Sequence, residues 1–268
     1  MSLKSIAKKV VPQRVRHAVK YVLSEDYRDR VFFEKDRQVG QRVFALTGGV
    51  VVAGPFKGLK YVSTARGSSI GPKLLGTYEL ELREIVEGII ARAYPTVVNI
   101  GAGEGYYAVG MAKRMPSTRF VCFDADASNQ EQIRTLAKLN GVESQLDVRG
   151  FCDDAALRDA LAGGGDTLVI CDIEGAEVEV LRPDAVPALT RVDLLVEMHD
   201  IVRKGCSAAV RSRFETTHQI EVIPTRRRKE SEFPAGVEVA STKDRLTCMD
   251  EGRGPTPMTF FWMRPKAG

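Results

Sequence analysis

Three closely spaced glycines that follow a short apolar run are the residues of this chain best suited to hold a ligand. The run Val97–Ile100 leads into Gly101-Ala102-Gly103-Glu104-Gly105. Glycine permits backbone conformations with positive φ and lets a bound molecule approach the main chain closely. A helix that begins after the last glycine would add free N–H groups at the same place. The pattern predicts a ligand-binding turn between a buried strand and a helix.

The spacing of Gly101, Gly103 and Gly105 distinguishes between two kinds of ligand. Dinucleotide-binding folds prefer G-x-G-x-x-G, in which the helix N-terminus holds a pyrophosphate. Here the third glycine comes one residue earlier, which is the form seen in proteins that bind S-adenosyl-L-methionine (SAM) and hold no phosphate. A tight turn without a ligand is the alternative interpretation.

Three further residues follow apolar runs and could hold the rest of such a ligand. Asp124 lies nineteen residues after Gly105. An acid at this distance, at the end of a second strand, can accept hydrogen bonds from both ribose hydroxyls. Cys152 and Asp153 follow the third run, where an adenine ring could lie. The alternative is that Cys152 belongs to the core and Asp153 caps the next helix.

Acids and a histidine end the fourth and fifth apolar runs, where ligands of open α/β sheets bind. His199 is the first candidate for a catalytic base, because its ordinary pKa of about 6.5 suits proton transfer near neutrality. Glu174 is the second candidate, and Asp172 is better suited to binding a cofactor or fixing an acceptor. Together with Asp200 these groups make a weak metal signature, so we predict no metal.

The elements that position these residues alternate along the chain. Runs such as 167–171 are apolar at nearly every position, as in a parallel sheet covered on both faces. Right-handed crossovers then predict a doubly wound, Rossmann-like α/β fold. The predicted strands are Thr96–Ile100, Arg119–Asp124, Gln145–Arg149, Thr167–Ile173, Val192–Met198, Gln219–Thr225 and Met258–Arg264, and helices are predicted over 82–90 and near 106–115, 129–139, 153–161 and 176–182.

Composition places these elements in one α/β domain with an N-terminal attachment. The chain has 268 residues, 44% of them hydrophobic, which suffices for a substantial core. No apolar run approaches the ~18 residues that span a bilayer. Five dispersed cysteines without a C-x-x-C pair indicate reduced thiols. We therefore expect a cytoplasmic protein without stable membrane insertion, divided into an extension, 1–75, and a main domain, 76–268.

The extension is predicted to contain a helix and a β-hairpin. Residues 3–23 have a helical pattern with a break at a proline, and two β-prone runs, 43–47 and 50–53, flank Gly48-Gly49 as the strands of a hairpin would. Residues 1–42 hold eleven basic and five acidic residues, which leaves 28 and 30 in the remainder. We interpret this basicity as a solvated helical face.

Three segments together resemble the FkbM-type family of class I SAM-dependent methyltransferases. They are Asn99–Gly105, Phe123-Asp124 and Cys171–Leu181, and the D-x-E-G-A-E-x-x-V-L run within the last is the most specific. The resemblance covers roughly residues 76–200. It implies a seven-stranded sheet with an antiparallel last strand, and SAM as the cosubstrate.

The resemblance also implies roles for single residues. The glycines Gly101, Gly103 and Gly105 would line the methionine and ribose, Asp124 would hold the ribose, and Tyr78 and Glu79 would close over the cofactor.

Two features of these segments concern acids. The family usually has an acid where this chain has Asn99, which can accept a hydrogen bond but supplies no charge to oppose the cofactor's ammonium. Glu177 and Glu179 of the D-x-E-G-A-E-x-x-V-L run are interpreted as ordinary helix-surface acids.

These observations predict a methyltransferase that acts on a hydroxyl of a small-molecule acceptor, with a sugar-containing compound as one candidate and N-methylation left open. One alternative is a nicotinamide-dependent oxidoreductase on a similar sheet. Another is a non-catalytic RNA-binding or interaction protein that uses the basic N-terminus and Arg226-Arg227-Arg228, although no RNA-binding signature accompanies them. We expect no nucleic-acid partner, and a homodimer is one candidate assembly.

Overall fold

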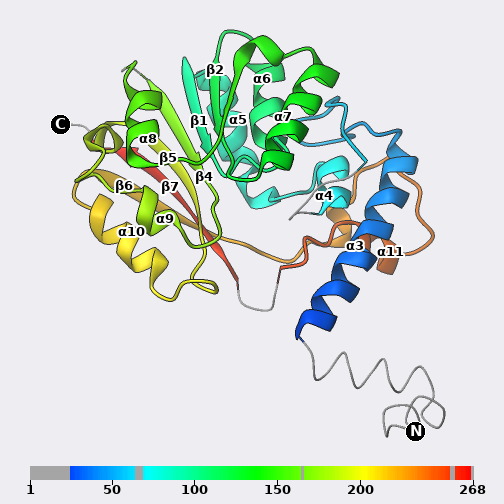
Figure 1. Ribbon diagram of the computed structural model, residues 1–268. Helices are drawn as coiled ribbons and strands as arrows, with labels where there is room; N and C mark the ends of the chain where they lie inside the picture. Colours follow the sequence, from blue (N-terminus) through cyan, green and yellow to red (C-terminus); the bar gives the residue numbers. More distant parts are fainter. Residues whose placement is uncertain (1–24, 64–68, 164–165, 254–256, 267–268) are drawn as a thin grey trace, which may run out of the picture.

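Seven strands form one mixed sheet in the order β3-β2-β1-β4-β5-β7-β6 (Figure 1). The computed structural model describes residues 25–63, 69–163, 166–253 and 257–266, so the predicted helix over 3–23 lies outside the described residues. The strands are β1 (Thr96–Ile100), β2 (Arg119–Phe123), β3 (Leu146–Arg149), β4 (Thr167–Cys171), β5 (Asp193–Met198), β6 (His218–Pro224) and β7 (Thr259–Pro265).

The strand directions confirm the predicted doubly wound fold with an antiparallel last strand. Strands β1 to β5 pair in parallel, whereas β7 runs antiparallel to both β5 and β6. Strand β1 lies between β2 and β4, and Ile100 is in register with Phe123 on one side and Cys171 on the other. The loops that follow these three strands therefore begin side by side, at the point where the strand order reverses and where such sheets bind ligands.

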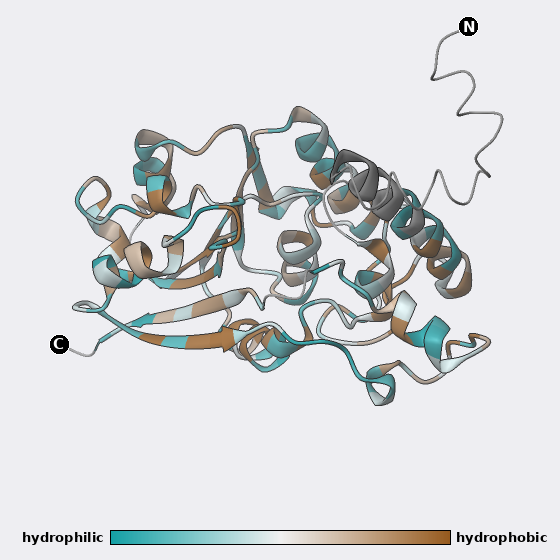
Figure 2. Ribbon diagram, turned by 90° about the horizontal axis from the view of Figure 1, so that it is seen from below, coloured by the Kyte–Doolittle hydropathy of each residue, from teal (hydrophilic) through white to brown (hydrophobic). Residues whose placement is uncertain are grey.

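Helices cover both faces of the sheet (Figure 1). Alternate strand residues enter two separate cores, so that Val97 packs with the first set of helices and Val98 with the second. Figure 2 shows hydrophobic residues gathered along the strands between these layers. The first set is α5 (Arg83–Arg92), α6 (Tyr106–Arg114) and α7 (Ala127–Asn140), and the second is α8 (Asp154–Leu161), α9 (Glu177–Val180) and α10 (Cys206–Phe214).

Three more helices extend the first core beyond the sheet. Val43, Leu74 and Cys248, one from each helix, belong to the same buried cluster as the strand residue Val97. The helices are α3 (Glu25–Thr47), α4 (Ile70–Leu75) and α11 (Thr242–Cys248). Short 3-10 turns are η1 (Leu80–Leu82), η2 (Glu143–Gln145), η3 (Pro187–Arg191) and η4 (Glu230–Glu232). Helix α4 carries residues of the extension to the edge of the ligand-binding end of the sheet.

The predicted β-hairpin around Gly48-Gly49 is wrong. Residues 43–47 are the last turn of α3, and within the described part of the chain Val50 makes a single bridge, with Lys60. The two glycines have φ of 62° and 69° and end the helix, as glycines at a helix C-terminus commonly do. The β-prone residues remain helical because Val43 is fully buried against the first core, and such packing outweighs a weak strand preference.

None of the helices in the described part of the chain is long and apolar enough to cross a membrane.

Candidate functional site

Two adjoining cavities lie beyond the carboxyl ends of the parallel strands. The tyrosine cavity, named for Tyr78, Tyr106 and Tyr107 in its wall, has a volume of about 370 Å³. The Asp124 cavity, which Asp124 helps to line, has a volume of about 520 Å³. Gly101, Asp172 and Glu174 line both cavities, so the two spaces meet at the ends of β1 and β4.

The three glycines of the predicted turn have different local functions. Gly101 has φ of 75°, and a Cβ there would lie 1.7 Å from the Asp172 carbonyl oxygen, so only glycine lets the two loops touch. Gly103 has φ of 56°, and a Cβ there would meet no atom within 4 Å. Gly105 has φ of 97° and packs against Ile133 of α7. Gly101 lines both cavities, whereas the other two lie outside the walls that the described residues form.

Asp124 both lines its cavity and anchors the glycine turn. Its carboxylate accepts hydrogen bonds from the backbone N–H groups of Gly103, at 2.8 Å, and Asp126, at 2.9 Å. The side-chain amide of Asn129 donates a third, at 3.2 Å. The carboxylate is thereby fixed at the end of β2, where the sequence predicts a ribose-binding acid.

The residues after β3 have separate positions. Cys152 is buried in the wall of the Asp124 cavity, and burial raises the pKa of its thiol to about 12, so the thiol stays protonated at neutral pH. Asp153 instead accepts a hydrogen bond from the Ala156 N–H at 2.8 Å and caps α8, and it lies outside the walls formed by the described residues. The capping alternative is therefore the arrangement observed for Asp153. Phe151 is 73% exposed at the cavity rim.

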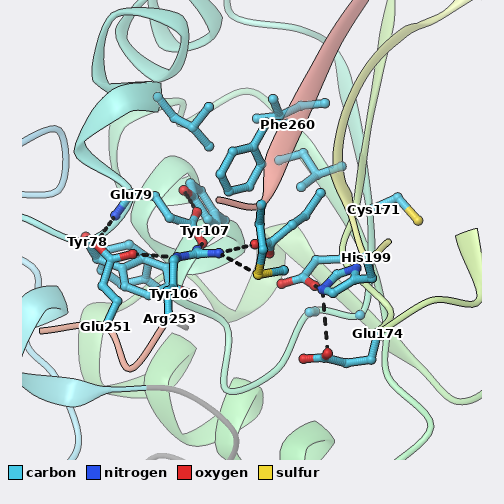
Figure 3. Close-up of a pocket in the computed structure, with 18 of the residues that line it drawn as sticks. Tyr78, Glu79, Tyr106, Tyr107, Cys171, Glu174, His199, Glu251, Arg253 and Phe260 are labelled. Carbon is cyan, nitrogen blue, oxygen red and sulfur yellow. Dashed lines mark hydrogen bonds and ion pairs between the residues drawn. The ribbon is translucent and has the colours of Figure 1, made fainter. Parts of the chain in front are cut away.

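His199 occupies the end of β5 and is only 2% exposed. Its Nδ1 lies 2.7 Å from Oε1 of Glu177, and its Nε2 lies 3.5 Å from carboxylate oxygens of both Asp172 and Glu174. Figure 3 shows His199 and Glu174 together on one side of the tyrosine cavity. The structure thus brings together the three residues that the sequence predicts as catalytic, at the junction of the two cavities.

The protonation of His199 depends on its carboxylate neighbours. Burial alone lowers the pKa of an imidazole, but the hydrogen bond to Glu177 and the charges of Asp172 and Glu197 outweigh it and raise the pKa of His199 to about 9. In the ligand-free protein the ring is therefore mainly an imidazolium at neutral pH. A cation bound next to Nε2 would favour the neutral ring, which can accept a proton.

The interpretation of Glu177 as a surface acid is wrong, whereas Glu179 is exposed as predicted. Glu177 is fully buried. Its carboxylate accepts hydrogen bonds from His199 and Cys206 and from the backbone N–H groups of Ile173 and Gly175, and these bonds replace those that water would provide. Burial raises the pKa of Glu177, but these bonds outweigh it and hold the pKa below its ordinary value. Glu177 therefore fixes the orientation of the imidazole as a charged acceptor.

The opposite side of the tyrosine cavity is a buried ion network centred on Arg253 (Figure 3). Arg253 pairs with Glu79 at 2.8 Å, with Glu251 at 2.8 Å, and also with Glu197. Tyr107 donates its hydroxyl to Glu79. Burial, followed by the charge of Glu197, raises the pKa of Glu79 to about 8. The predicted cofactor residues Tyr78 and Glu79 both line this cavity, but sequence reasoning missed Arg253, which comes from a loop far along the chain.

A second buried ion pair joins α4 to the glycine turn. Lys73 pairs with Glu104, and Tyr61 donates its hydroxyl to the same carboxylate. Lys73 and Glu104 are 3% and 2% exposed, and both line the tyrosine cavity together with the buried Asn99. Neither charged residue is among the predicted site residues, although Glu104 lies within the predicted glycine turn.

Acids outnumber bases in the tyrosine cavity. Among the described residues, its basic members are Lys73, His199 and Arg253, and its acidic members are Glu79, Glu104, Asp172, Glu174, Glu197 and Glu251. The Asp124 cavity has acidic walls and, within the described part of the chain, no lysine or arginine. Both cavities therefore favour a cation over an anion.

The carboxylates at the cavity junction also bear on metal binding. One ligand atom each from Asp172, Glu174 and His199 lies within 4.8 Å of the others, which is close enough to share an ion. Asp200 does not join them, because its carboxylate accepts hydrogen bonds from the backbone and hydroxyl of Ser207. The absence of a metal stays a prediction.

Comparison with known proteins finds methyltransferases among solved structures. No protein-family profile matches the sequence, and no curated protein matches it. The chain resembles the O-methyltransferase TomG from Streptomyces achromogenes in complex with SAM, at 12% identity over 85% of this chain and 89% of that chain, with a TM-score of 0.46. An O-methyltransferase from Bacillus cereus in complex with SAH matches at 8% identity over 69% and 81%, with a TM-score of 0.45. Precorrin-6y C5,15-methyltransferase from Geobacter metallireducens matches at 15% identity over 68% and 87%, with a TM-score of 0.45.

Proposed function

We propose that this chain is a SAM-dependent methyltransferase that methylates a hydroxyl of a small-molecule or sugar-containing acceptor. The observation that carries the proposal is the junction of two cavities at Gly101, Asp172 and Glu174, with His199 facing it. The Asp124 cavity would take the adenosine, with Asp124 on the ribose and Cys152 beside the adenine. The tyrosine cavity would take the methionine part and the acceptor.

The charges of the walls support this cofactor over a dinucleotide. When bound, SAM supplies a methyl group activated by a positively charged sulfur. The acids Asp172 and Glu174 at the junction would stabilise that positive charge. A nicotinamide dinucleotide would bring two phosphates to an Asp124 cavity whose described charged residues are all acids. The wall chemistry therefore disfavours the oxidoreductase alternative.

The residues at the junction would perform two tasks. The first is alignment of the acceptor oxygen with the methyl group, which is worth up to about 7–11 kcal/mol in well-oriented reactions. The second is removal of the hydroxyl proton by Nε2 of His199, held in place by Glu177, because general bases add roughly 10²–10⁴-fold. Glu174 is the alternative base, and Asp172 would fix the acceptor or the cofactor. Within this function, the segments around Asn99–Gly105 and Cys171–Leu181 support membership of the FkbM type.

A titration of the full chain tests the proposal. We expect calorimetry to show binding of SAM and of its demethylated product S-adenosylhomocysteine, and no binding of NAD at the same concentrations. The basic N-terminal segment makes RNA the second ligand to test, at two salt concentrations. Binding of NAD or RNA without binding of SAM would replace the proposal with the corresponding alternative.

A further inference from the structure

A third cavity adjoins the tyrosine cavity and has the opposite charge. The arginine cavity, named for the four arginines in its wall, has a volume of about 600 Å³ and shares Glu251 and Arg253 with the tyrosine cavity. Bases outnumber acids in this wall, so an anion that the cavity junction disfavours would be favoured here. The charged wall residues in the described part of the chain are Arg226, Arg227, Arg228, Arg253, Asp250 and Glu251.

Three of these arginines are consecutive and follow β6 directly. Thr225, which precedes them, donates its hydroxyl to the carbonyl oxygen of Met258 at 3.1 Å and accepts the Met258 N–H at 2.9 Å. These bonds join the end of β6 to the start of β7. The side chain of Arg228 is 5% exposed and pairs with Glu81 at 2.6 Å and with Glu251 at 2.5 Å. The arginine run is therefore anchored at both of its ends.

The arginines of this cavity differ in how far their charge is compensated. Arg228 and Arg253 each pair with two or more carboxylates, and Arg226 has one carboxylate partner, Glu232, at 2.6 Å. Arg227 is exposed, and among the described residues its guanidinium has neither an ion pair nor a hydrogen bond. Arg227, with Arg226 next to it, is therefore the group best placed to hold an anion.

The arginine cavity lies beyond the wall of the tyrosine cavity that is opposite His199. Glu251 and Arg253 form the shared wall, and Figure 3 shows them across the tyrosine cavity from His199 and Glu174. A molecule whose hydroxyl faced Nε2 of His199 could extend across the tyrosine cavity and end beside the arginines. Its anionic end would then lie away from the acid-rich junction, where the repulsion would be strongest.

A polynucleotide is the competing occupant of the arginine run. Binding of nucleic acid depends on contacts from several basic side chains to successive phosphates. After residue 42, however, the chain has 28 basic and 30 acidic residues, and within the arginine run Arg227 alone lacks a carboxylate partner among the described residues. This arrangement suits one phosphate or pyrophosphate group better than a chain of phosphates.

We infer that the arginine cavity binds a phosphate or pyrophosphate group of the methyl acceptor through Arg227 and Arg226. The inference rests on the proposed function and names its acceptor class, which is a phosphorylated small molecule such as a sugar phosphate. Guanidinium groups suit this ligand because their planar N–H pairs match two phosphate oxygens. The phosphate only positions the molecule. The acceptor oxygen bonds to the methyl carbon as the carbon–sulfur bond breaks and leaves its electron pair on sulfur, and the hydroxyl proton passes to His199.

Calorimetry of the full chain with inorganic pyrophosphate tests the subsite. We expect saturable binding whose affinity stays within about twofold when S-adenosylhomocysteine is present, because the two ligands occupy different cavities. Arg227→Gln should weaken pyrophosphate binding about fivefold, the range for a partly exposed charge pair. Arg264→Gln is the matched control, because Arg264 is an exposed arginine near the opposite end of β7 and should leave the affinity unchanged. Asp250→Asn removes an exposed acid of the same wall and should strengthen binding.

The results separate this inference from the proposed function. Unchanged pyrophosphate affinity in Arg227→Gln, or displacement of pyrophosphate by S-adenosylhomocysteine, would overturn the inference and leave the proposed function intact. Binding of an oligouridine RNA that depends on Arg227, without binding of pyrophosphate, would assign the arginines to RNA instead. Binding of pyrophosphate through Arg227 in a chain that binds neither SAM nor S-adenosylhomocysteine would overturn the proposed function, and with it the assignment of the anion to a methyl acceptor.

Methyl transfer to acceptors screened in matched pairs gives a second readout. Each pair consists of a free sugar and its phosphate ester, and the ester should have the higher kcat/KM. Arg227→Gln should reduce this preference about fivefold, whereas Arg264→Gln should not change it. A higher kcat/KM for the free sugar in the unmodified protein would overturn the inference.

Discussion

The contact between Glu177 and His199 gives a prediction that needs no knowledge of the acceptor. Glu177→Gln keeps the size and position of the side chain but replaces a charged acceptor by a neutral one. The lost charge-assisted bond, 2.7 Å long in a fully buried setting, is worth about 1.5–3 kcal/mol. Since each pKa unit corresponds to about 1.36 kcal/mol, the pKa of His199 should fall from about 9 by roughly one to two.

Nuclear magnetic resonance can measure this pKa directly, because the chain has only three histidines. The ring proton signal that disappears in His199→Asn identifies the residue, and its chemical shift is followed from pH 5 to pH 10.5 in the ligand-free protein. Glu179→Gln is the matched control, because Glu179 lies two residues further along, is exposed, and pairs with Arg203 instead. A His199 pKa near the ordinary value of about 6.5 in the unmodified protein, or one that Glu177→Gln does not move, would refute the reasoning.

The same contact predicts how stability changes with pH. The folded-state pKa of His199 lies above its unfolded value of about 6.5, so the protonated ring stabilises the fold fully below that pH. This contribution is lost as the pH rises through about 9, and its size is on the order of 3 kcal/mol. Urea unfolding at pH 6 and pH 9.5 should show a smaller difference for Glu177→Gln than for Glu179→Gln, and equal differences would contradict the linkage.

Three further predictions concern the ligand and the reaction. Asp124→Ala should weaken SAM binding by more than tenfold in calorimetry, because the ribose and the Gly103 N–H both lose their acceptor. The control Asp159→Asn, on the exposed side of α8, should leave SAM affinity unchanged. Unchanged affinity in Asp124→Ala would remove Asp124 from the site. His199→Asn keeps a donor for Glu177 but should lower turnover of an acceptor found by screening by about 100-fold or more, with SAM affinity nearly intact. Dialysis against EDTA should leave turnover unchanged; a loss restored by Mg²⁺ or Mn²⁺ would assign the Asp172, Glu174 and His199 cluster to a metal.

Much of the fold follows from local sequence patterns. The predicted strand Thr96–Ile100 matches β1 at both ends, and the other strands agree within two residues. Strand β4 is the clearest case, because its residues are all buried and a run buried on both faces is mainly apolar. The hairpin prediction failed because residues 43–47 combine a strand preference with a helical burial pattern, and only the packing of Val43 on the first core decides between them. Helices α10 and α11 were not predicted, and their residues lack a strong apolar periodicity.

Some residues of the site can be predicted from the strand that precedes them, whereas others come from segments distant in the sequence. Asp172 and His199 could be placed together from sequence, because neighbouring parallel strands end at the same edge of a sheet. The burial of Glu177 could not be predicted from sequence, because an acid at this position of a short helix could equally face solvent. Lys73 and Arg253 enter from α4 and from the loop after α11, and no periodicity specifies which distant loop will close over a strand end. Only their charge could have indicated them, because a lysine or arginine that packs near an acid-rich strand end is a candidate ion-pair partner for those acids.

Some of the acids in the two cavities are partly protonated. This protonation lowers the negative charge of the walls and explains how an acid-rich pocket can remain stable before a ligand binds. Burial and the charges of Glu197 and Glu79 raise the pKa of Asp172 well above its ordinary value, and the pKa of Glu79 rises to about 8. A proton on either group therefore reduces the repulsion that several carboxylates in one pocket would otherwise produce. A positively charged ligand at the junction would lower the pKa of these acids, so its binding should release protons. The affinity for such a ligand should therefore increase as the pH rises toward 8. An uncharged or anionic ligand would gain nothing from the same arrangement, which is why the charge of the walls bears more directly on the chemistry of the site than the shape of the sheet does.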